Sequence, residues 1–274
     1  ALFQVSFTVD PGEFLAIVGP SGCGKSTLLS LLSGLLEPEE GAIYIEDTPL
    51  KEASTGIGYM LQRDHLFEWR TIRENAALGL EIQHQKTREA MQELDEMLRN
   101  YGLAAFASAR PSELSGGMRQ RAVIAMALCC NPCLLLADEP TTALDVTIQK
   151  QILNLFLELQ ESDRMSIMMV THDIGVAAQV ADQIAIMYGG IILECGATRQ
   201  VLETPANPYT KALIAALPKS GNRERLVAIE GQPPTIVHMP PGCPFSNRCA
   251  YATEACRQSV PELKPINEHH MTAC

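Results

Sequence analysis

The stretch GPSGCGKS, from Gly19 to Ser26, constrains this chain more than any other. It fits the pattern G-x-x-x-x-G-K-[ST], a glycine-rich loop whose backbone N–H groups converge on a phosphate. An apolar run at residues 14–18 precedes the loop and a leucine-rich run at residues 27–36 follows it. This context of strand, loop and helix is the one in which such a loop works, because the helix directs its positive end at the anion. The sequence therefore predicts a nucleotide phosphate site; the alternative is a chance match in a glycine-rich turn.

Each residue type in the loop has an expected use. Glycines allow the backbone to bend, Lys25 would reach the β- and γ-phosphates, and the Ser26 hydroxyl would ligate Mg²⁺. ATP and Mg²⁺ are the expected cofactors. The residues assigned to nucleotide binding are Gly19, Pro20, Ser21, Gly22, Cys23, Gly24, Lys25, Ser26 and Thr27.

Composition limits the classes of protein to which the chain can belong. Its 274 residues, of which 46% are hydrophobic, suit one or two domains with a sizeable core. The net charge of −11 argues against a nucleic-acid partner. No apolar run approaches the ~20 residues of a membrane helix, and no signal peptide is apparent. The chain begins at Ala1, without Met, almost directly on a strand expected at residues 3–9, so we expect it to be cut at its N-terminus.

Polar residues follow two further apolar runs that we expect to be buried strands. Asp138 and Glu139 follow residues 134–137, and Thr171 and His172 follow residues 167–170. Ligands bind at strand ends in open α/β sheets. Asp138 could therefore hold Mg²⁺ and Glu139 could polarise an attacking water, although an ordinary acidic loop is the alternative. Taken alone, a histidine in the position of His172 is more often a hydrogen-bonded polar residue than a catalytic one.

The segment LSGGMRQ, residues 114–120, offers a further anion site. Ser115 suits the N-cap of a helix expected at residues 118–130, and Gly116 and Gly117 leave backbone N–H groups bare at its start. The alternative is a capped helix with no ligand.

Taken together, these motifs resemble the nucleotide-binding subunit of an ABC transporter. The Q-loop glutamine would be Gln62, LSGGM at residues 114–118 would be the signature sequence, and Ala143-Leu144-Asp145 would be the D-loop. Asp138 and Glu139 would end the Walker B strand, and His172 would be the switch histidine. Met118 departs from the glutamine that many members carry. The family's adenine-stacking aromatic lies upstream of the first expected strand, so we expect ATP to be held mainly by its phosphates.

The resemblance implies roles and partners. Glu139, His172 and Gln62 would be catalytic, and Ser26, Gln62 and Asp138 would hold Mg²⁺. Ser115, Gly116, Gly117 and Asp145 would complete the ATP site of a second cassette, identical or not. Other implied partners are transmembrane permease subunits and, indirectly, a solute-binding protein, at the cytoplasmic face of the membrane. Residues 64–73, with Phe67 and Trp69, are the candidate docking surface; local packing of these two rings is the alternative.

The transported solute is less clearly indicated, because two subfamilies are resembled. Residues 58–80 resemble importers of nitrate, sulfonate and taurine, whereas residues 134–153 and 207–218 resemble the peptide and nickel group. We expect an importer ATPase for peptides or nickel. A soluble ABC ATPase of translation or DNA repair, a P-loop kinase and an exporter cassette are the alternatives.

Four cysteines near the C-terminus form a separate motif: Cys243, Cys249, Cys256 and Cys274. Four thiolates can close around iron–sulfur or zinc, and the resembled peptide-importer subunits can carry a [4Fe–4S] cluster on such cysteines. Unliganded thiols or disulfides are the alternative. His238, His269 and His270 are expected to be solvated loop residues, and the other cysteines buried small hydrophobes.

The expected fold is α/β, a P-loop NTPase of the ABC cassette type with a mixed sheet core. The ATPase domain would span residues 1–206 and include a helical subdomain at about residues 63–131. A small cysteine-bearing extension would follow at residues 207–274.

Overall fold

A computed structural model describes residues 2–51, 56–142, 144–217, 229–234 and 239–274. The chain forms two compact units: residues up to Ser30 together with Val170–Cys274, and Leu31–Met169. Helix α1 (Lys25–Leu32) and strand β6 (Ser166–Thr171) are the elements in which the chain passes from one unit to the other. The domain boundary expected after residue 206 does not coincide with this division and stays a prediction.

The sheet of the first unit is mixed. β1 (Phe14–Val18) lies parallel to β7 (Gln183–Tyr188), β7 is antiparallel to β8 (Ile191–Ala197), and β10 (His270–Thr272) and β9 (Lys264–Asn267) continue the antiparallel edge. β1 is buried along its whole length, which explains why the FLAIV run carries no polar residue. The chain enters the phosphate loop directly from its carboxyl end.

Helices of the first unit pack near this sheet. α7 (Ile174–Val180) contacts β1, and α8 (Thr198–Glu203) contacts β7 and β8. The extension adds α9 (Pro208–Ala215), a short 3-10 turn (Ser246–Arg248) and α10 (Glu254–Gln258). α8 therefore packs on the antiparallel strands of this sheet.

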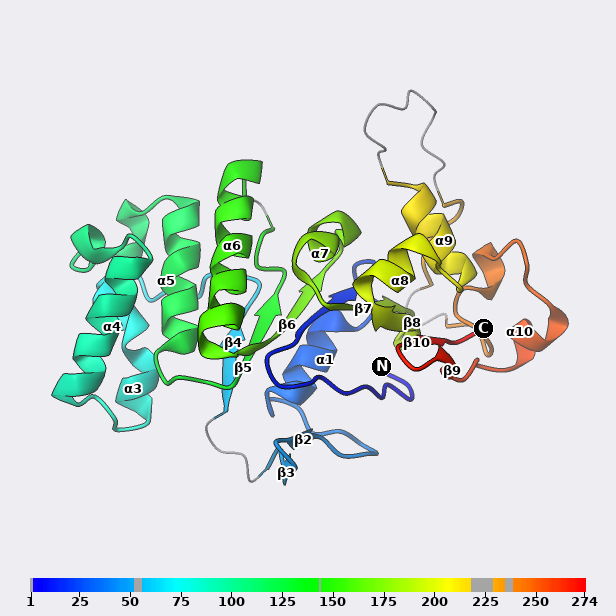
Figure 1. The fold of residues 1–274 in the computed structure, drawn as a ribbon, viewed down its shortest axis with the longest axis horizontal. Coiled ribbons are helices and arrows are strands. Elements are labelled where there is room, and N and C mark those ends of the chain that lie inside the picture. Colours follow the sequence, from blue (N-terminus) through cyan, green and yellow to red (C-terminus); the bar gives the residue numbers. More distant parts are fainter. Residues whose placement is uncertain (1, 52–55, 143, 218–228, 235–238) are drawn as a thin grey trace. The chain divides into compact units, whose positions relative to one another are not determined.

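The second unit combines a parallel strand pair with a group of helices. β4 (Ile57–Met60) pairs in parallel with β5 (Leu134–Asp138), and β2 (Tyr44–Ile45) forms a hairpin with β3 (Thr48–Pro49). The helices α3, α4 and α5 lie side by side in the cyan and green part of Figure 1. The helices of this unit are α2 (Ile72–Ala76), α3 (Leu78–Ile82), α4 (Arg88–Asn100), α5 (Gly116–Leu128) and α6 (Val146–Asp163), with 3-10 turns at Ala104–Phe106 and Pro111–Glu113.

Local sequence explains where two helices of this unit begin. Thr71 forms a capping box with Glu74 at the start of α2, and Thr87 caps α4 by accepting from the Ala90 N–H. α4 is amphipathic, since Leu94 and Leu98 are buried on one of its faces.

Two expectations about local structure are wrong. Residues 3–9 form no strand in the described structure, although exposed and half-buried side chains alternate from Gln4 to Val9. The helix after the phosphate loop ends at Leu32 instead of residue 36, because Gly34 turns the chain at a φ of 75°.

The histidines also differ from expectation. His270 is only 3% exposed, and its Nε2 lies 2.7 Å from Oε1 of Glu194, which is fully buried. His269 is exposed, and His238 lies outside the described residues. His270 is thus part of the first unit's core, because β10 pairs with β8 and turns this side chain inward.

Within the ranges described, no helix is both long and apolar enough to span a lipid bilayer.

Candidate ATP site

The phosphate loop has the backbone geometry that its glycines predict. Gly22 and Gly24 adopt φ of 78° and 107°, which glycine reaches without steric cost. At Gly19 the constraint is space, since a Cβ would lie 2.3 Å from the carbonyl oxygen of Met187. Ser21, Gly22, Ser26 and Thr27 are exposed, so a ligand can reach them.

Lys25, the first residue of α1, lies folded over this loop. Its Nζ donates to the carbonyl oxygens of Gly19 at 2.8 Å and Pro20 at 3.0 Å, and the residue is only 5% exposed. Beneath it, burial raises the pKa of the Cys23 thiol while the Lys25 charge partly opposes the rise. Cys23 is therefore a neutral packing residue, and the Lys25 side chain is fixed on two carbonyl oxygens of the loop.

His172 lies in the same unit as the loop. The carbonyl oxygen of Thr171, at the end of β6, accepts from the Gly19 N–H at 3.3 Å, so this strand end is tied to the beginning of the loop. His172 follows directly and is exposed, and Asp173 caps α7 through the N–H groups of Gly175 and Val176. The structure thus brings the predicted switch histidine to the strand that contacts the phosphate loop.

The second unit brings together Gln62, Asp138 and Glu139. Asp138 ends β5 and is 4% exposed, and Gln62 follows β4, the parallel neighbour of β5. The Gln62 side-chain amide donates to Oε2 of Glu139 at 3.4 Å. The Thr142 hydroxyl, which sequence reasoning missed, donates to the same oxygen at 3.0 Å; its only signal was its place three residues after Glu139. Glu139 has a φ of 48°, uncommon for a residue other than glycine.

The signature segment forms the N-terminus of α5. The Ser115 hydroxyl accepts from the Met118 N–H at 3.4 Å, which confirms the predicted N-cap. Ser115 and Gly116 are exposed, whereas Gly117 is buried, where a Cβ would lie 2.6 Å from Cγ2 of Ile148. The start of α5 is therefore packed on α6 through one glycine and open to solvent at the other.

The D-loop residue Asp145 has a local role as well. Its carboxylate caps α6 by accepting from the N–H groups of Thr147 and Ile148, each at 3.0 Å, and the residue is exposed. Ala143 of the same motif lies outside the described residues. The expected residues thus fall into two local sets, the phosphate loop with His172 in one unit and the remaining residues in the other.

The chemistry of the donors fits Mg²⁺. Hydroxyl, carboxylate and amide oxygens of Ser26, Asp138 and Gln62 are the hard ligands that this ion takes, usually together with water and substrate phosphates. No part of this set is a soft sulfur donor.

The four C-terminal cysteines do not form a metal site as the structure arranges them. The thiols of Cys249, Cys256 and Cys274 lie near enough to Cys243 to add to the rise that burial causes in its pKa. However, no three metal-binding side chains among the described residues come together around a common centre. The Thr253 hydroxyl lies 3.2 Å from the Cys256 sulfur and lowers the pKa of that thiol.

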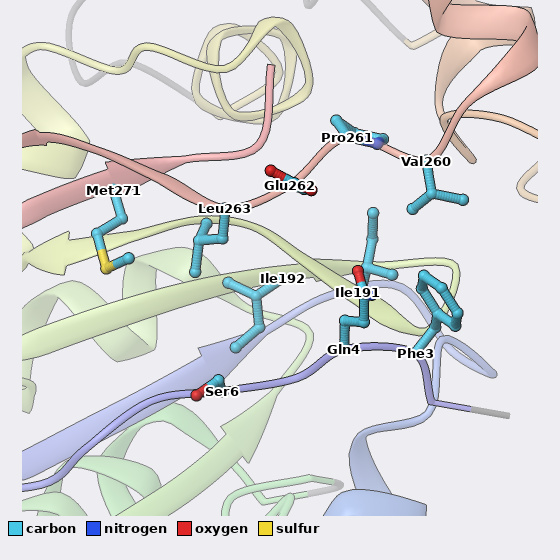
Figure 2. A pocket seen from close by; sticks show the side chains of 10 residues that line it. All are labelled: Phe3, Gln4, Ser6, Ile191, Ile192, Val260, Pro261, Glu262, Leu263 and Met271. Carbon is cyan, nitrogen blue, oxygen red and sulfur yellow. The ribbon is translucent and has the colours of Figure 1, made fainter. Parts of the chain in front are cut away.

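A pocket of about 290 Å³ lies elsewhere in the first unit. Figure 2 shows that the N-terminal segment, the start of β8 and residues 260–263 surround it, with Phe3 and Val260 at one end and Met271 at the other. None of the expected ATP-site residues lines it. Its wall is mixed, with apolar side chains such as Ile191 and Leu263 and the polar side chains of Gln4, Ser6 and Glu262.

Comparisons with known proteins identify the family of the chain. The sequence profile of the ABC transporter family matches residues 2–142, and that of the oligopeptide/dipeptide transporter C-terminal region matches residues 193–256. A Brucella ovis protein with a provisional peptide-import name is 40% identical over 307 residues, which cover 100% of this chain and 90% of the relative. The oligopeptide transport ATP-binding protein OppD of Haemophilus influenzae is 39% identical, with coverage of 100% and 90%.

Solved structures are similar too. The ATP-binding cassette MJ0796, in a dimeric post-hydrolysis state bound to ADP and Pi, superposes with a TM-score of 0.65 and 34% identity, covering 72% of this chain and 90% of that one. CbiO1 of Clostridium perfringens, part of an ABC transporter complex, gives a TM-score of 0.68 and 27% identity, covering 74% and 84%. The chain belongs to the ABC transporter family: it is an ATP-binding, ATP-hydrolysing cassette that also carries the C-terminal region of the oligopeptide and dipeptide transporters.

Proposed function

We propose that this chain hydrolyses ATP to energise the import of peptides by an ABC importer. The observation that carries the proposal is the pairing of the two family matches in one chain, the ABC cassette at residues 2–142 and the oligopeptide/dipeptide region at residues 193–256. Relatives that match the whole chain are named for oligopeptide and dipeptide transport. The resemblance of residues 58–80 to nitrate and sulfonate importers finds no counterpart among these relatives.

The site residues divide the work of phosphoryl transfer. Lys25 supplies a buried positive charge to the phosphates, and Ser26, Asp138 and Gln62 would hold Mg²⁺, which neutralises charge on the β- and γ-phosphates when bound. Glu139 accepts hydrogen bonds from Gln62 and Thr142 and is the base that would orient the attacking water. His172 would contact the γ-phosphate side of the site.

A second cassette is the partner that the site needs. Ser115 and Gly116 are exposed at the N-terminus of α5, where backbone N–H groups and the helix dipole favour an anion. The similar cassette MJ0796 is a dimer in its ADP-bound form. We propose that Ser115, Gly116, Gly117 and Asp145 of one protomer complete the ATP site of its partner.

The membrane partners would dock beside Gln62, which would place the chain on the cytoplasmic face of the membrane. Trp69 is 70% exposed, and its ring packs on Phe67 at a centroid distance of 4.7 Å. Phe67 is in turn held by Asn75, which accepts from its N–H and donates to its carbonyl oxygen. The local packing of the two rings and the exposure of Trp69 therefore coexist, and an aromatic residue on a fixed support suits a docking site.

The [4Fe–4S] cluster on Cys243, Cys249, Cys256 and Cys274 stays a prediction. The thiols are close enough to influence one another's pKa, which supports the prediction. Among the described residues they do not converge on a common centre, which does not support it. Iron and sulfide analysis of chain prepared without oxygen tests it; absence of both removes it.

The function is tested with the chain assembled with its permease subunits in lipid vesicles and a solute-binding protein. Short peptides should stimulate phosphate release, and nickel, nitrate or taurine should not. Stimulation by nitrate or taurine alone would favour the other importer group. Transfer of phosphate to an acceptor without free phosphate would indicate a kinase.

A further inference from the structure

The turn between β7 and β8 contacts the phosphate loop. Gly189 and Gly190 have φ of 57° and 85°, the left-handed backbone of a two-residue hairpin. The N–H of Gly190 donates to the carbonyl oxygen of Cys23 at 3.0 Å. Met187 precedes the last residue of β7, and its carbonyl group lies against Gly19. The turn and the end of β7 therefore brace the loop near its beginning and near its middle.

The C-terminal extension contacts the same turn from another side. A Cβ on Gly189 would lie 2.5 Å from Cβ of Pro244, so the proline packs directly on the turn. Arg248 donates from Nη1 to the Tyr188 hydroxyl at 3.0 Å. Its other nitrogens donate to the carbonyl oxygens of Glu230 at 2.7 Å and Ile229 at 2.9 Å, which fixes the guanidinium in place.

Three aromatic rings make this contact rigid. Tyr188, Tyr209 and Phe245 have mutual centroid distances of 4.6, 5.1 and 5.5 Å. The rings come from β7, from α9 and from the segment between Cys243 and Cys249, and all three residues are at most 4% exposed. Aromatic groups packed in this way resist displacement, because moving one opens a cavity among the others.

We propose that Tyr188 and Arg248 are positioning residues for ATP binding: the extension holds the β7–β8 turn, and the turn holds the phosphate loop. Pro244, Phe245 and Arg248 all lie between Cys243 and Cys249. The residues that contact the turn therefore belong to the cysteine-bearing segment itself. The extension is thereby coupled to the affinity for ATP. This inference rests on the proposed function, because it requires that the loop at Gly19 to Ser26 holds ATP.

The test uses the chain in complex with its permease subunits and compares Arg248→Ala, Arg248→Lys and Tyr188→Phe with the parent. Tyr188→Phe removes one hydroxyl and keeps the ring stack, so it preserves folding. Arg257→Ala, which removes an exposed arginine of α10, is the matched control. The readouts are Kd for Mg·ATP, kcat at saturating ATP and the thermal midpoint.

Arg248→Ala and Tyr188→Phe should raise Kd and KM for Mg·ATP by roughly three- to tenfold, with kcat close to the parent value, because a misplaced loop weakens ground-state and transition-state binding alike. Arg248→Lys should fall between, and Arg257→Ala should match the parent. A lower kcat at unchanged Kd would overturn the inference, whether or not the thermal midpoint falls. Such a result would show that the substitutions do not change the affinity for ATP.

Lys25→Ala separates the two claims. If it abolishes ATP binding while Arg248→Ala and Tyr188→Phe leave Kd unchanged, the inference fails and the proposed function stands. If Lys25→Ala itself binds ATP as the parent does, the proposed function fails.

Discussion

The side-chain amide of Gln62 donates a hydrogen bond to Oε2 of Glu139 at 3.4 Å. This contact joins the residue after β4 to the carboxylate after β5, and both strands are parallel neighbours in one unit. A movement of the Gln62 segment would therefore change the position of the group expected to polarise water.

Gln62→Ala should lower kcat for ATP hydrolysis roughly tenfold or more, because Glu139 loses a donor that orients it. Kd for Mg·ATP should change far less, since Lys25 and the loop are untouched. Steady-state kinetics and equilibrium binding measure the two effects. Gln92→Ala, an exposed glutamine on α4, is the control. A normal kcat in Gln62→Ala would remove Gln62 from the mechanism.

Gly116→Ala and Gly117→Ala should behave differently although they are adjacent. Among the described residues, a Cβ at Gly116 would have Leu144 as its nearest neighbour, at 3.9 Å, whereas one at Gly117 would meet Ile148 at 2.6 Å. Gly117→Ala should therefore lower the thermal midpoint of the isolated chain. Gly116→Ala should leave stability intact and still weaken ATP-dependent dimerisation, which light scattering detects. Full dimerisation of Gly116→Ala would show that the start of α5 does not face a partner's ATP.

Glu194→Ala should destabilise the chain by about 3 kcal/mol or more, because it leaves His270 and two backbone donors buried without their acceptor. The Glu194 carboxylate accepts from the N–H groups of Ala206 at 2.6 Å and Asn207 at 3.1 Å, besides its contact with His270. Urea unfolding measures the loss. The exposed Glu203→Ala should cost no more than about 1 kcal/mol; equal costs would contradict the assigned role.

The contact of Arg73 with Asp95 should make the free energy of unfolding of the second unit depend on pH. The Arg73 guanidinium hydrogen-bonds both carboxylate oxygens, at 2.6 and 2.9 Å, and lowers the pKa of Asp95. The stabilisation by this contact is therefore present above the ordinary pKa of a carboxyl group. It is lost as the pH falls through the lowered pKa that Asp95 has in the folded state. Asp95→Asn should be less stable than the parent at pH ~7, and the difference should shrink progressively in acid. A difference independent of pH would contradict this, and Glu96→Gln is the control.

Periodicity and motif spacing were enough to predict the buried strands β1, β5 and β6 and the capped start of helix α5. These depend on local rules: a buried strand needs an apolar run, and a helix start needs a hydroxyl or carboxylate cap. The absence of a strand at residues 3–9 could not be predicted, because a strand also needs a neighbour. The buried state of His270 could not be predicted either, since it depends on a carboxylate 76 residues away on β8.

For the candidate site, the identity of the residues was predictable from the motifs, but the contacts that hold their side chains in place were not. The hydrogen bond from Gln62 to Glu139, and the crowding of Gly117 by Ile148, arise from packing between elements distant in sequence. The roles of Gln62, Glu139, His172 and the signature residues in the reaction stay predictions.

The most direct test of the account is Glu139→Gln, followed by phosphate release and by the mass of the chain in solution with Mg·ATP. The account predicts that the variant binds ATP, releases no phosphate above the level of Lys25→Ala, and accumulates as an ATP-dependent dimer that the parent forms only briefly. Normal phosphate release by Glu139→Gln, or a monomer at saturating Mg·ATP, would contradict it.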